Sequence, residues 1–340
     1  MIISSLTSSN ACEERNQWRS FSLTTGPRVL FAIIYSVGFV LFPWEYLLGL
    51  SFPDKLNYIA RFDQLQAFGV DSINPLGGVL GAFISESLWG FILYGLGLSG
   101  FSAEQALLLI SFFCILAIVV FVSSKVNFTL AAIFLLNPLI VDFVMAQQRS
   151  ALAFAGFLAF VSTKANVLRI LIVSGCMFIH VAFGLLLVGY VLAGAVARLR
   201  VANSPLVNRA AHLLIAFIAA LVLLLGKDFF LSAIGDRRAA TSSGSQSIVY
   251  ALFWLALIIY IVVFSRGRLD WLLNFTCLFV SLFMVAVFLN TYSSRYLVFA
   301  LPFLVIALAR LPFNESVLSY FLLFCYQFVQ WVYWWGWFVR

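Results

Sequence analysis

Long apolar runs separated by short polar segments make up most of this chain. A helix needs about 20 apolar residues to cross a lipid bilayer. Runs that approach this length lie at 29–50, 104–124, 211–231, 248–265, 271–291, 296–310 and 316–338. We predict a membrane-spanning helix in each of them.

The region 126–198 is apolar nearly throughout, but polar residues interrupt it at spacings too short for comfortable full spans. The interruptions are Asn137-Pro138, the run Gln147-Gln148-Arg149, the pair Lys164 and Arg169, and His180. This pattern predicts a set of short or broken helices. In membrane proteins such helices usually border a cavity.

Three further segments do not fit a simple crossing. Residues 51–74 alternate apolar with charged positions, which predicts an amphipathic helix at the membrane interface. Residues 75–99 are rich in glycine and carry Glu86 near the middle, which favours a re-entrant segment. Residues 232–247 are polar and rich in Ser and Gly, which predicts an extracytoplasmic loop.

The composition agrees with this pattern and excludes a soluble protein. Hydrophobic residues make up 64% of the 340 positions and charged residues only 10%, whereas soluble domains carry roughly 25% charged residues. We therefore predict an all-α, polytopic membrane protein with about 10–12 transmembrane or re-entrant helices. A cytoplasmic segment, 1–28, precedes a single membrane domain, 29–340. The two histidines and five dispersed cysteines do not indicate a metal site. We expect the cysteines in the core. We expect no cofactor and no nucleic-acid partner.

Most of the net charge of +7 serves to orient the chain in the membrane, because cytoplasmic loops are enriched in Lys and Arg. Basic groups flank the predicted spans at Arg15, Arg19, Arg28, Arg198, Arg200, Arg209, Arg266, Arg268 and Arg310. With these groups in the cytoplasm, the turn at 291–295 and the loop 232–247 lie outside.

Four arginines then fall on the outer face, where the orientation rule does not explain them: Arg149, Arg237, Arg238 and Arg295. An arginine beside apolar helices is costly unless it is paired or engaged with a ligand, and its planar fork suits phosphate oxygens. We expect an anionic substrate at these residues. Ion pairing with Asp142, Asp228 or Asp236 is the alternative.

Four more residues are candidates for chemistry on the same face. A chain reversal at His180 would place its imidazole there as a proton acceptor, although a hydrogen-bonded core histidine is the alternative. Glu86 is a carboxylate within an apolar stretch. Asp54 and Tyr58 are four residues apart and share one helix face, which is also compatible with a solvated face.

Four short motifs resemble the EpsG/Wzy family of bacterial polysaccharide polymerases. They are DKLNY (Asp54 to Tyr58), NP followed by QRSALA (Asn137-Pro138 and Gln148 to Ala153), FIHVAF (Phe178 to Phe183) and SRYLVFALPF (Ser294 to Phe303). Two positions depart from the family pattern. Ser150 stands where the family usually has Gln, and Glu86-Ser87-Leu88-Trp89 stands where it has Glu-Pro and an aromatic residue.

The resemblance implies a polymerase that joins oligosaccharide repeat units carried on undecaprenyl diphosphate, at the outer face of the bacterial inner membrane, on a GT-C-like scaffold. It implies a metal-independent glycosyltransferase, with a flippase and a chain-length regulator of the same pathway as partners. The site residues would be a catalytic base at His180, then Glu86 or Asp54, diphosphate contacts at Arg149, Arg295, Arg237 and Arg238, and further contacts at Tyr58 and Gln148. The loop 232–247 would act as a lid.

Other classes of protein stay open at this point. An O-antigen ligase would use a similar donor, but we expect it to carry a larger outer domain. A transporter or flippase for a lipid-linked or anionic substrate would show internal repeats, and the chain shows none. A structural subunit of a membrane complex would leave the outward arginines without a ligand.

Overall fold

The computed structural model describes residues 26–48, 52–73, 81–83, 85–233, 248–265, 269–289, 291 and 294–338. Within these ranges the regular structure is helical and no strand occurs. The predicted diphosphate contacts Arg237 and Arg238 lie outside the described residues, as does the predicted loop 232–247 from residue 234 onward. The all-α prediction is therefore confirmed for the described part of the chain.

The N-terminal part contains α2 (Gly26–Leu41), α3 (Trp44–Leu48), α4 (Pro53–Phe68), the 3₁₀ turn η1 (Val70–Ser72), α6 (Ser87–Leu98) and α7 (Ala103–Ser123). The run predicted as one span at 29–50 is not a single helix. The backbone leaves the helix after Leu41, and Pro43 precedes the short α3. Proline lacks the N–H that a continuing helix would need and disfavours a helical residue before it.

The middle region is divided as predicted into α8 (Phe128–Leu135), α9 (Pro138–Met145), α10 (Gln148–Ser162), α11 (Asn166–Met177) and α12 (Ala182–Arg198). Local side chains explain two of the boundaries. Asn127 accepts a hydrogen bond from the Thr129 amide at the start of α8, and Asn137 accepts one from the Leu139 amide at the start of α9. A proline in the first turn of α9 completes its start.

The C-terminal part contains α13 (Pro205–Ala233), α14 (Ile248–Phe264), α15 (Trp271–Phe288), α16 (Ser294–Ala309) and α17 (Phe313–Phe338). By length and composition, α7, α13 over Pro205–Gly226 and α15 can each cross a membrane, and the pair α8 and α9, bent by 72°, counts as a fourth. In the part of the chain that the structure describes, six shorter apolar helices have 10–17 residues. These helices support a helical membrane protein, while a total of 10–12 spans stays a prediction.

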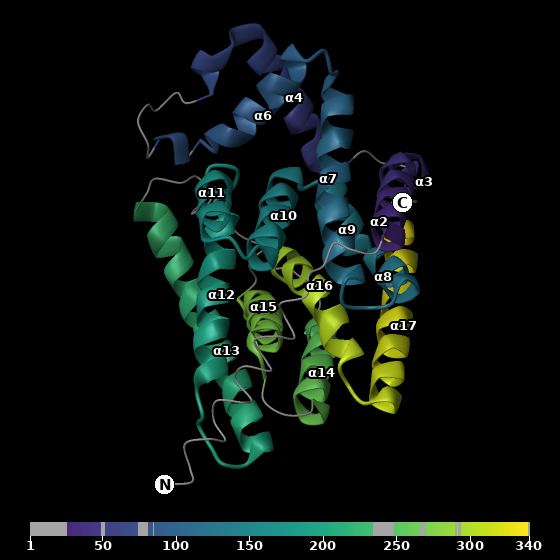
Figure 1. Cartoon of the computed structure of the whole chain (residues 1–340), viewed down its shortest axis with the longest axis vertical. Coiled ribbons are helices and arrows are strands. Elements are labelled where there is room, and N and C mark those ends of the chain that lie inside the picture. The colour runs from purple at the N-terminus through teal and green to yellow at the C-terminus, as the bar shows by residue number, and fades with distance from the viewer. Residues whose placement is uncertain are drawn as a thin grey trace.

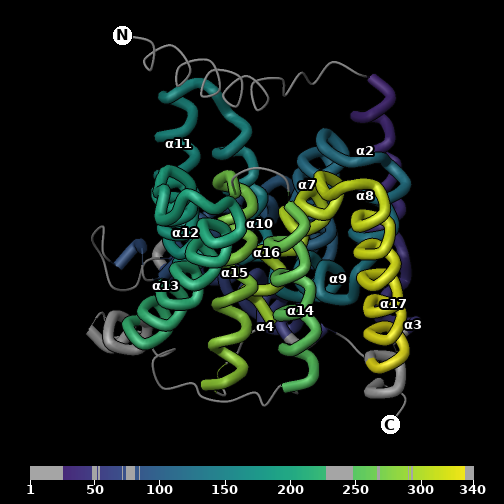
Figure 2. Tube along the Cα trace, turned by 90° about the horizontal axis from the view of Figure 1, so that it is seen from below, coloured from purple at the N-terminus to yellow at the C-terminus, as the bar shows by residue number. Residues whose placement is uncertain are grey.

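The helices surround α15 and α16, which lie at the centre of the bundle (Figure 1). Of the 18 residues of α15, 89% are buried, and phenylalanines on α15 and α16 pack against those of α10. By contrast, α13 and α17 at the periphery (Figure 2) expose many large apolar side chains, as a lipid-facing surface does. The prediction that the cysteines are core residues is wrong for Cys325, which is exposed on α17.

The segment predicted to be amphipathic forms α4 and η1, and α4 packs beside α6 at one end of the molecule (Figure 1). The approach is close because Gly97 lacks a side chain. A Cβ there would lie 2.0 Å from the Gln66 amide. The end of α6 leads directly into α7, which begins at the same end of the molecule (Figure 1).

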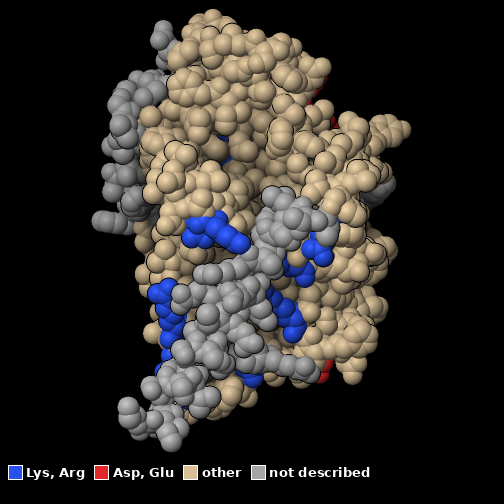
Figure 3. All heavy atoms as spheres, in the orientation of Figure 1, with Lys and Arg blue, Asp and Glu red and all other residues tan. Residues whose placement is uncertain are grey.

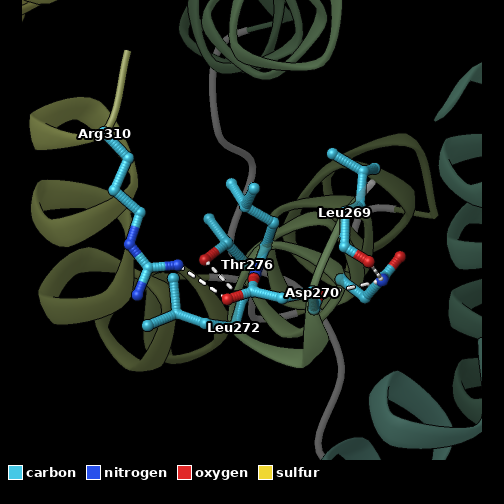
Figure 4. Close-up of polar contacts among 7 residues, drawn as sticks. Leu269, Asp270, Leu272, Thr276 and Arg310 are labelled. Atoms are coloured by element: carbon cyan, nitrogen blue, oxygen red, sulfur yellow. Dashed lines mark hydrogen bonds and ion pairs between the residues drawn. The ribbon is translucent and has the colours of Figure 1, made fainter. Parts of the chain in front are cut away.

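Basic side chains gather on the face of the molecule drawn in Figure 3. Arg310 follows the last turn of α16 and donates a 2.7 Å hydrogen bond to Asp270, the N-cap of α15 (Figure 4). Lys125, just beyond α7, lies near Arg310. Burial and the positive charge of Arg310 both lower the pKa of the Lys125 amine. The end of α7, the end of α16 and the start of α15 therefore meet on one side, which is the side predicted to be cytoplasmic.

Candidate functional site

Glu86 lies at the junction between the glycine-rich segment and α6. It is the one non-glycine residue with a positive φ (54°) in the described part of the chain, and only 4% of its surface is exposed. A left-handed conformation is uncommon for such a residue, and strained backbone conformations cluster at functional sites. The Glu86 carboxylate does not cap α6. Instead it contacts two side chains from distant parts of the chain, Arg149 and His180.

Arg149 lies in the first turn of α10 and donates to Glu86 Oε2 through Nη1. Its guanidinium also lies over the Tyr58 ring, 5.4 Å from the ring centroid. The neighbouring Gln148 fixes this turn, because its Nε2 donates to Leu107 O (3.1 Å) and Ser111 Oγ (2.8 Å) on α7. The structure therefore brings Arg149 to the site, while the Gln148 side chain anchors α10 to α7.

His180 lies in the turn between α11 and α12, at the position where we considered a change of chain direction. Its Nδ1 forms a hydrogen bond with Glu86 Oε1. A backbone hydrogen bond of 3.1 Å from Leu88 N to Phe178 O also ties this turn to the start of α6. An ionised carboxylate can only accept hydrogen bonds, so in the neutral imidazole Nδ1 carries the hydrogen and Nε2 carries the lone pair. This tautomer is the one that a general base requires.

Asp54 and Tyr58, both on α4, contact the arginines of the site. Arg295, in the first turn of α16, has Nη2 3.9 Å from Asp54 Oδ2, and these two side chains are 39% and 40% exposed. An ion pair this long and this exposed contributes little to stability. Tyr58 is buried, and its burial raises the pKa of its hydroxyl although Arg149 partly lowers it. Tyr58 is therefore a neutral hydroxyl at physiological pH.

Among the described side chains, Arg149 forms an ion pair with Glu86, and Arg295 lies 3.9 Å from Asp54. Of the counter-ions that we considered, Asp142 accepts a hydrogen bond of 2.7 Å from Gln147 Nε2, whereas Asp236 and the side chain of Asp228 lie outside the described residues. Two of the three candidate bases therefore also serve as counter-ions, and an anionic substrate would have to share or displace them.

Arg61 is a third arginine near the site and was missing from the predicted set. It lies on α4 one turn beyond Tyr58 and donates to Gln64 Oε1 and Ser72 O, both at 2.8 Å. Partial burial and the charge of Arg149 lower the pKa of Arg61, which places the two guanidinium groups near each other. The spacing 54, 58, 61 along one helix face was the available signal.

His212, the other histidine, lies outside this site. It is fully buried on α13, with Nε2 3.2 Å from Leu199 O. In the described part of the chain, no group of three or more His, Cys, Asp or Glu side chains could hold a metal ion.

The site thus combines a buried carboxylate, an oriented imidazole and a cluster of arginines, gathered from α4, α6, α10, α16 and the turn before α12. This arrangement can bind an anion and accept a proton from a hydroxyl group. Comparisons with protein-family models, with curated proteins and with solved structures give no match for this chain.

Proposed function

We propose that this protein is a membrane glycosyltransferase that joins oligosaccharide repeat units carried on undecaprenyl diphosphate into O-antigen or exopolysaccharide. One observation carries the proposal. Asp54, Tyr58, Arg149, His180 and Arg295, which come from the motifs that resemble the polymerase family, form contacts with one another or with Glu86. Residues so far apart in sequence have no local reason to meet.

The arginines suit a lipid diphosphate donor. Arg149 and Arg295 would contact its phosphate oxygens and stabilise the negative charge that develops as the diphosphate leaves. The Arg295 pair with Asp54 is long and partly exposed, so a phosphate can replace the carboxylate at small cost. Arg149 would keep its contact with Glu86 while it shares its remaining N–H groups.

His180 suits activation of the acceptor. The acceptor hydroxyl oxygen would attack the anomeric carbon of the donor, and the bond from that carbon to the diphosphate oxygen would break. The hydroxyl proton would move to His180 Nε2, and undecaprenyl diphosphate would leave with the electron pair of the broken bond. Glu86 would hold the imidazole in place and stabilise its positive charge. Glu86 is thus better suited to positioning His180 than to acting as the base.

The location of the site relative to the basic face supports chemistry at the outer membrane surface. Arg295 begins α16 and Arg310 follows its end. At 1.5 Å per residue, the intervening helix separates them by roughly 22 Å. If the Arg310 end lies in the cytoplasm, as basic loops favour, the site faces the opposite side, where a lipid-linked substrate would be polymerised.

The test is the surface glycan of cells that carry variants of the site. Arg149→Ala and Arg295→Ala are each expected to leave glycan of a single repeat unit, as judged by a surface-glycan gel. A normal ladder of long chains from both variants would refute the assignment.

A transporter or flippase remains the second candidate, because a buried cluster of Glu86, Arg149 and His180 also suits a proton relay. It predicts movement of the lipid-linked unit across the bilayer without formation of a new glycosidic bond. Chain length in a purified system separates the two functions.

A further inference from the structure

Gln147 is a buried amide beside the site whose role the proposed reaction leaves unexplained. It lies in the turn between α9 and α10, two residues before Arg149, and is 5% exposed. Its backbone N–H donates to Phe143 O (3.1 Å) and Asp142 O (3.2 Å), so the residue is held firmly in the turn.

The two ends of the Gln147 amide have different surroundings. Nε2 donates to Asp142 Oδ2 at 2.7 Å, whereas Oε1 is buried and has no hydrogen-bond partner. An ionised carboxylate accepts hydrogen bonds but does not donate them, so the amide nitrogen of Gln147 must face Asp142. The oxygen Oε1 is therefore the atom without a partner. A buried acceptor without a partner destabilises the folded protein, because the desolvated oxygen loses its hydrogen bonds to water.

Other buried amide oxygens lack a partner too, but their surroundings differ. In Gln148, Gln327 and Gln330, Nε2 donates to a backbone carbonyl, to Ser111 or to the Tyr250 hydroxyl, so these amides connect helices. Gln147 instead pairs with an ionisable side chain. The Gln147–Asp142 pair lies beside the proposed site, because Gln147 is in the turn that leads directly into Arg149 in the first turn of α10.

We propose that Gln147 and Asp142 form a glycan-binding subsite, in which Gln147 Oε1 and the Asp142 carboxylate accept hydrogen bonds from sugar hydroxyl groups. This inference rests on the proposed function and adds the part of the substrate that the arginines do not recognise. The arginines present N–H donors for phosphate, and the Gln147–Asp142 pair presents oxygen acceptors for hydroxyl donors. The site would then read both the charged and the uncharged part of one lipid-linked molecule.

The test compares two lipids on the purified full-length protein in lipid nanodiscs. One is the lipid-linked repeat unit isolated from cells that lack this protein, and the other is undecaprenyl diphosphate without sugar. The wild type is expected to bind the glycan-bearing lipid at least about tenfold more tightly. Gln147→Met is expected to lose about tenfold of this preference while it binds the bare lipid unchanged.

Gln327→Met is the matched control, because it also removes a buried amide whose Oε1 lacks a partner, on α17. It is expected to keep the full preference. Asp142→Asn removes the charge at nearly constant volume and is expected to lower the preference in the same direction, so the inference stays testable if Gln147→Met does not fold.

An unchanged preference in Gln147→Met would mean that water occupies the Oε1 position and would overturn the subsite. An equal loss for both lipids would overturn it as well, because the residue would then support the site as a whole. If the wild type binds neither lipid, the proposed function fails and the subsite fails with it. If the wild type binds both equally, only the subsite fails.

Discussion

Glu86 and His180 are joined by a hydrogen bond between Glu86 Oε1 and His180 Nδ1, across 94 positions of sequence. The other oxygen of the same carboxylate accepts from Arg149. One side chain therefore holds the proposed base and a proposed phosphate contact at a fixed relation to each other. The residue that makes both contacts also has a left-handed backbone conformation, with a φ of 54°.

Replacing the Glu86 carboxylate with an amide tests whether its charge or its volume is needed for activity. Glu86→Gln keeps the side-chain volume but removes the negative charge and allows the amide to donate to His180, which favours the wrong imidazole tautomer. We expect a loss of about 10²–10⁴-fold in turnover, measured as the rate of polymer formation. Glu104→Gln, an exposed change in the first turn of α7, is the control and should keep wild-type turnover. Equal activity of the two variants would rule out a role for the Glu86–His180 pair in the reaction.

His180 can be tested by chemical rescue. His180→Ala is expected to reduce turnover about 10²–10⁴-fold, because the acceptor hydroxyl loses its proton acceptor. Added imidazole should restore part of the rate if the base is the missing function. His212→Ala should lower thermal stability instead, since His212 is fully buried, and imidazole should not affect it. Failure of imidazole to restore any activity to a folded His180→Ala protein would favour a structural role.

The two ends of α16 provide a matched pair of arginine variants. Arg295→Ala removes the cation that lies 3.9 Å from Asp54, and Arg310→Ala removes the cation bonded to Asp270 on the other side. We expect polymerisation to be abolished by the first change and preserved by the second, as measured by glycan chain length. Loss of activity in both at normal protein levels would mean that the arginines act through helix stability.

Sidedness is tested by cysteine labelling in a variant without native cysteines. Ser99 and Ser204 are both exposed, the first between α6 and α7 near the site side and the second before α13 in the basic loop. An impermeant thiol reagent applied from outside is expected to label Ser99→Cys and to leave Ser204→Cys unlabelled. Ser243→Cys, outside the described residues, should also be labelled. The reverse pattern would place the site in the cytoplasm.

The helices were largely predictable, because their signals are local. The run predicted at 104–124 forms α7 (Ala103–Ser123), and Asn137-Pro138 marks the break between α8 and α9. The break at Pro43 was missed, since apolar content outweighed a single proline in the sequence pattern. Local apolar patterns do not determine the number of full spans.

The sequence predicted most residues of the site but not the contacts between them. Glu86, Arg149 and His180 stood out because charged groups are costly inside apolar stretches. That Glu86 is the partner of both others could not be read from the sequence, since such contacts depend on how α6, α10 and α12 pack. Arg61 was missed because a charge on an amphipathic helix is usually solvated.

The central claim is bond formation, and a purified system tests it most directly. The protein in lipid nanodiscs would be given only the lipid-linked repeat unit, in the presence of a metal chelator. The account predicts glycan chains longer than one unit and one undecaprenyl diphosphate released for each new linkage, without addition of a divalent ion. Recovery of the unchanged single unit from wild-type protein, or its transfer across the bilayer without lengthening, would contradict the account.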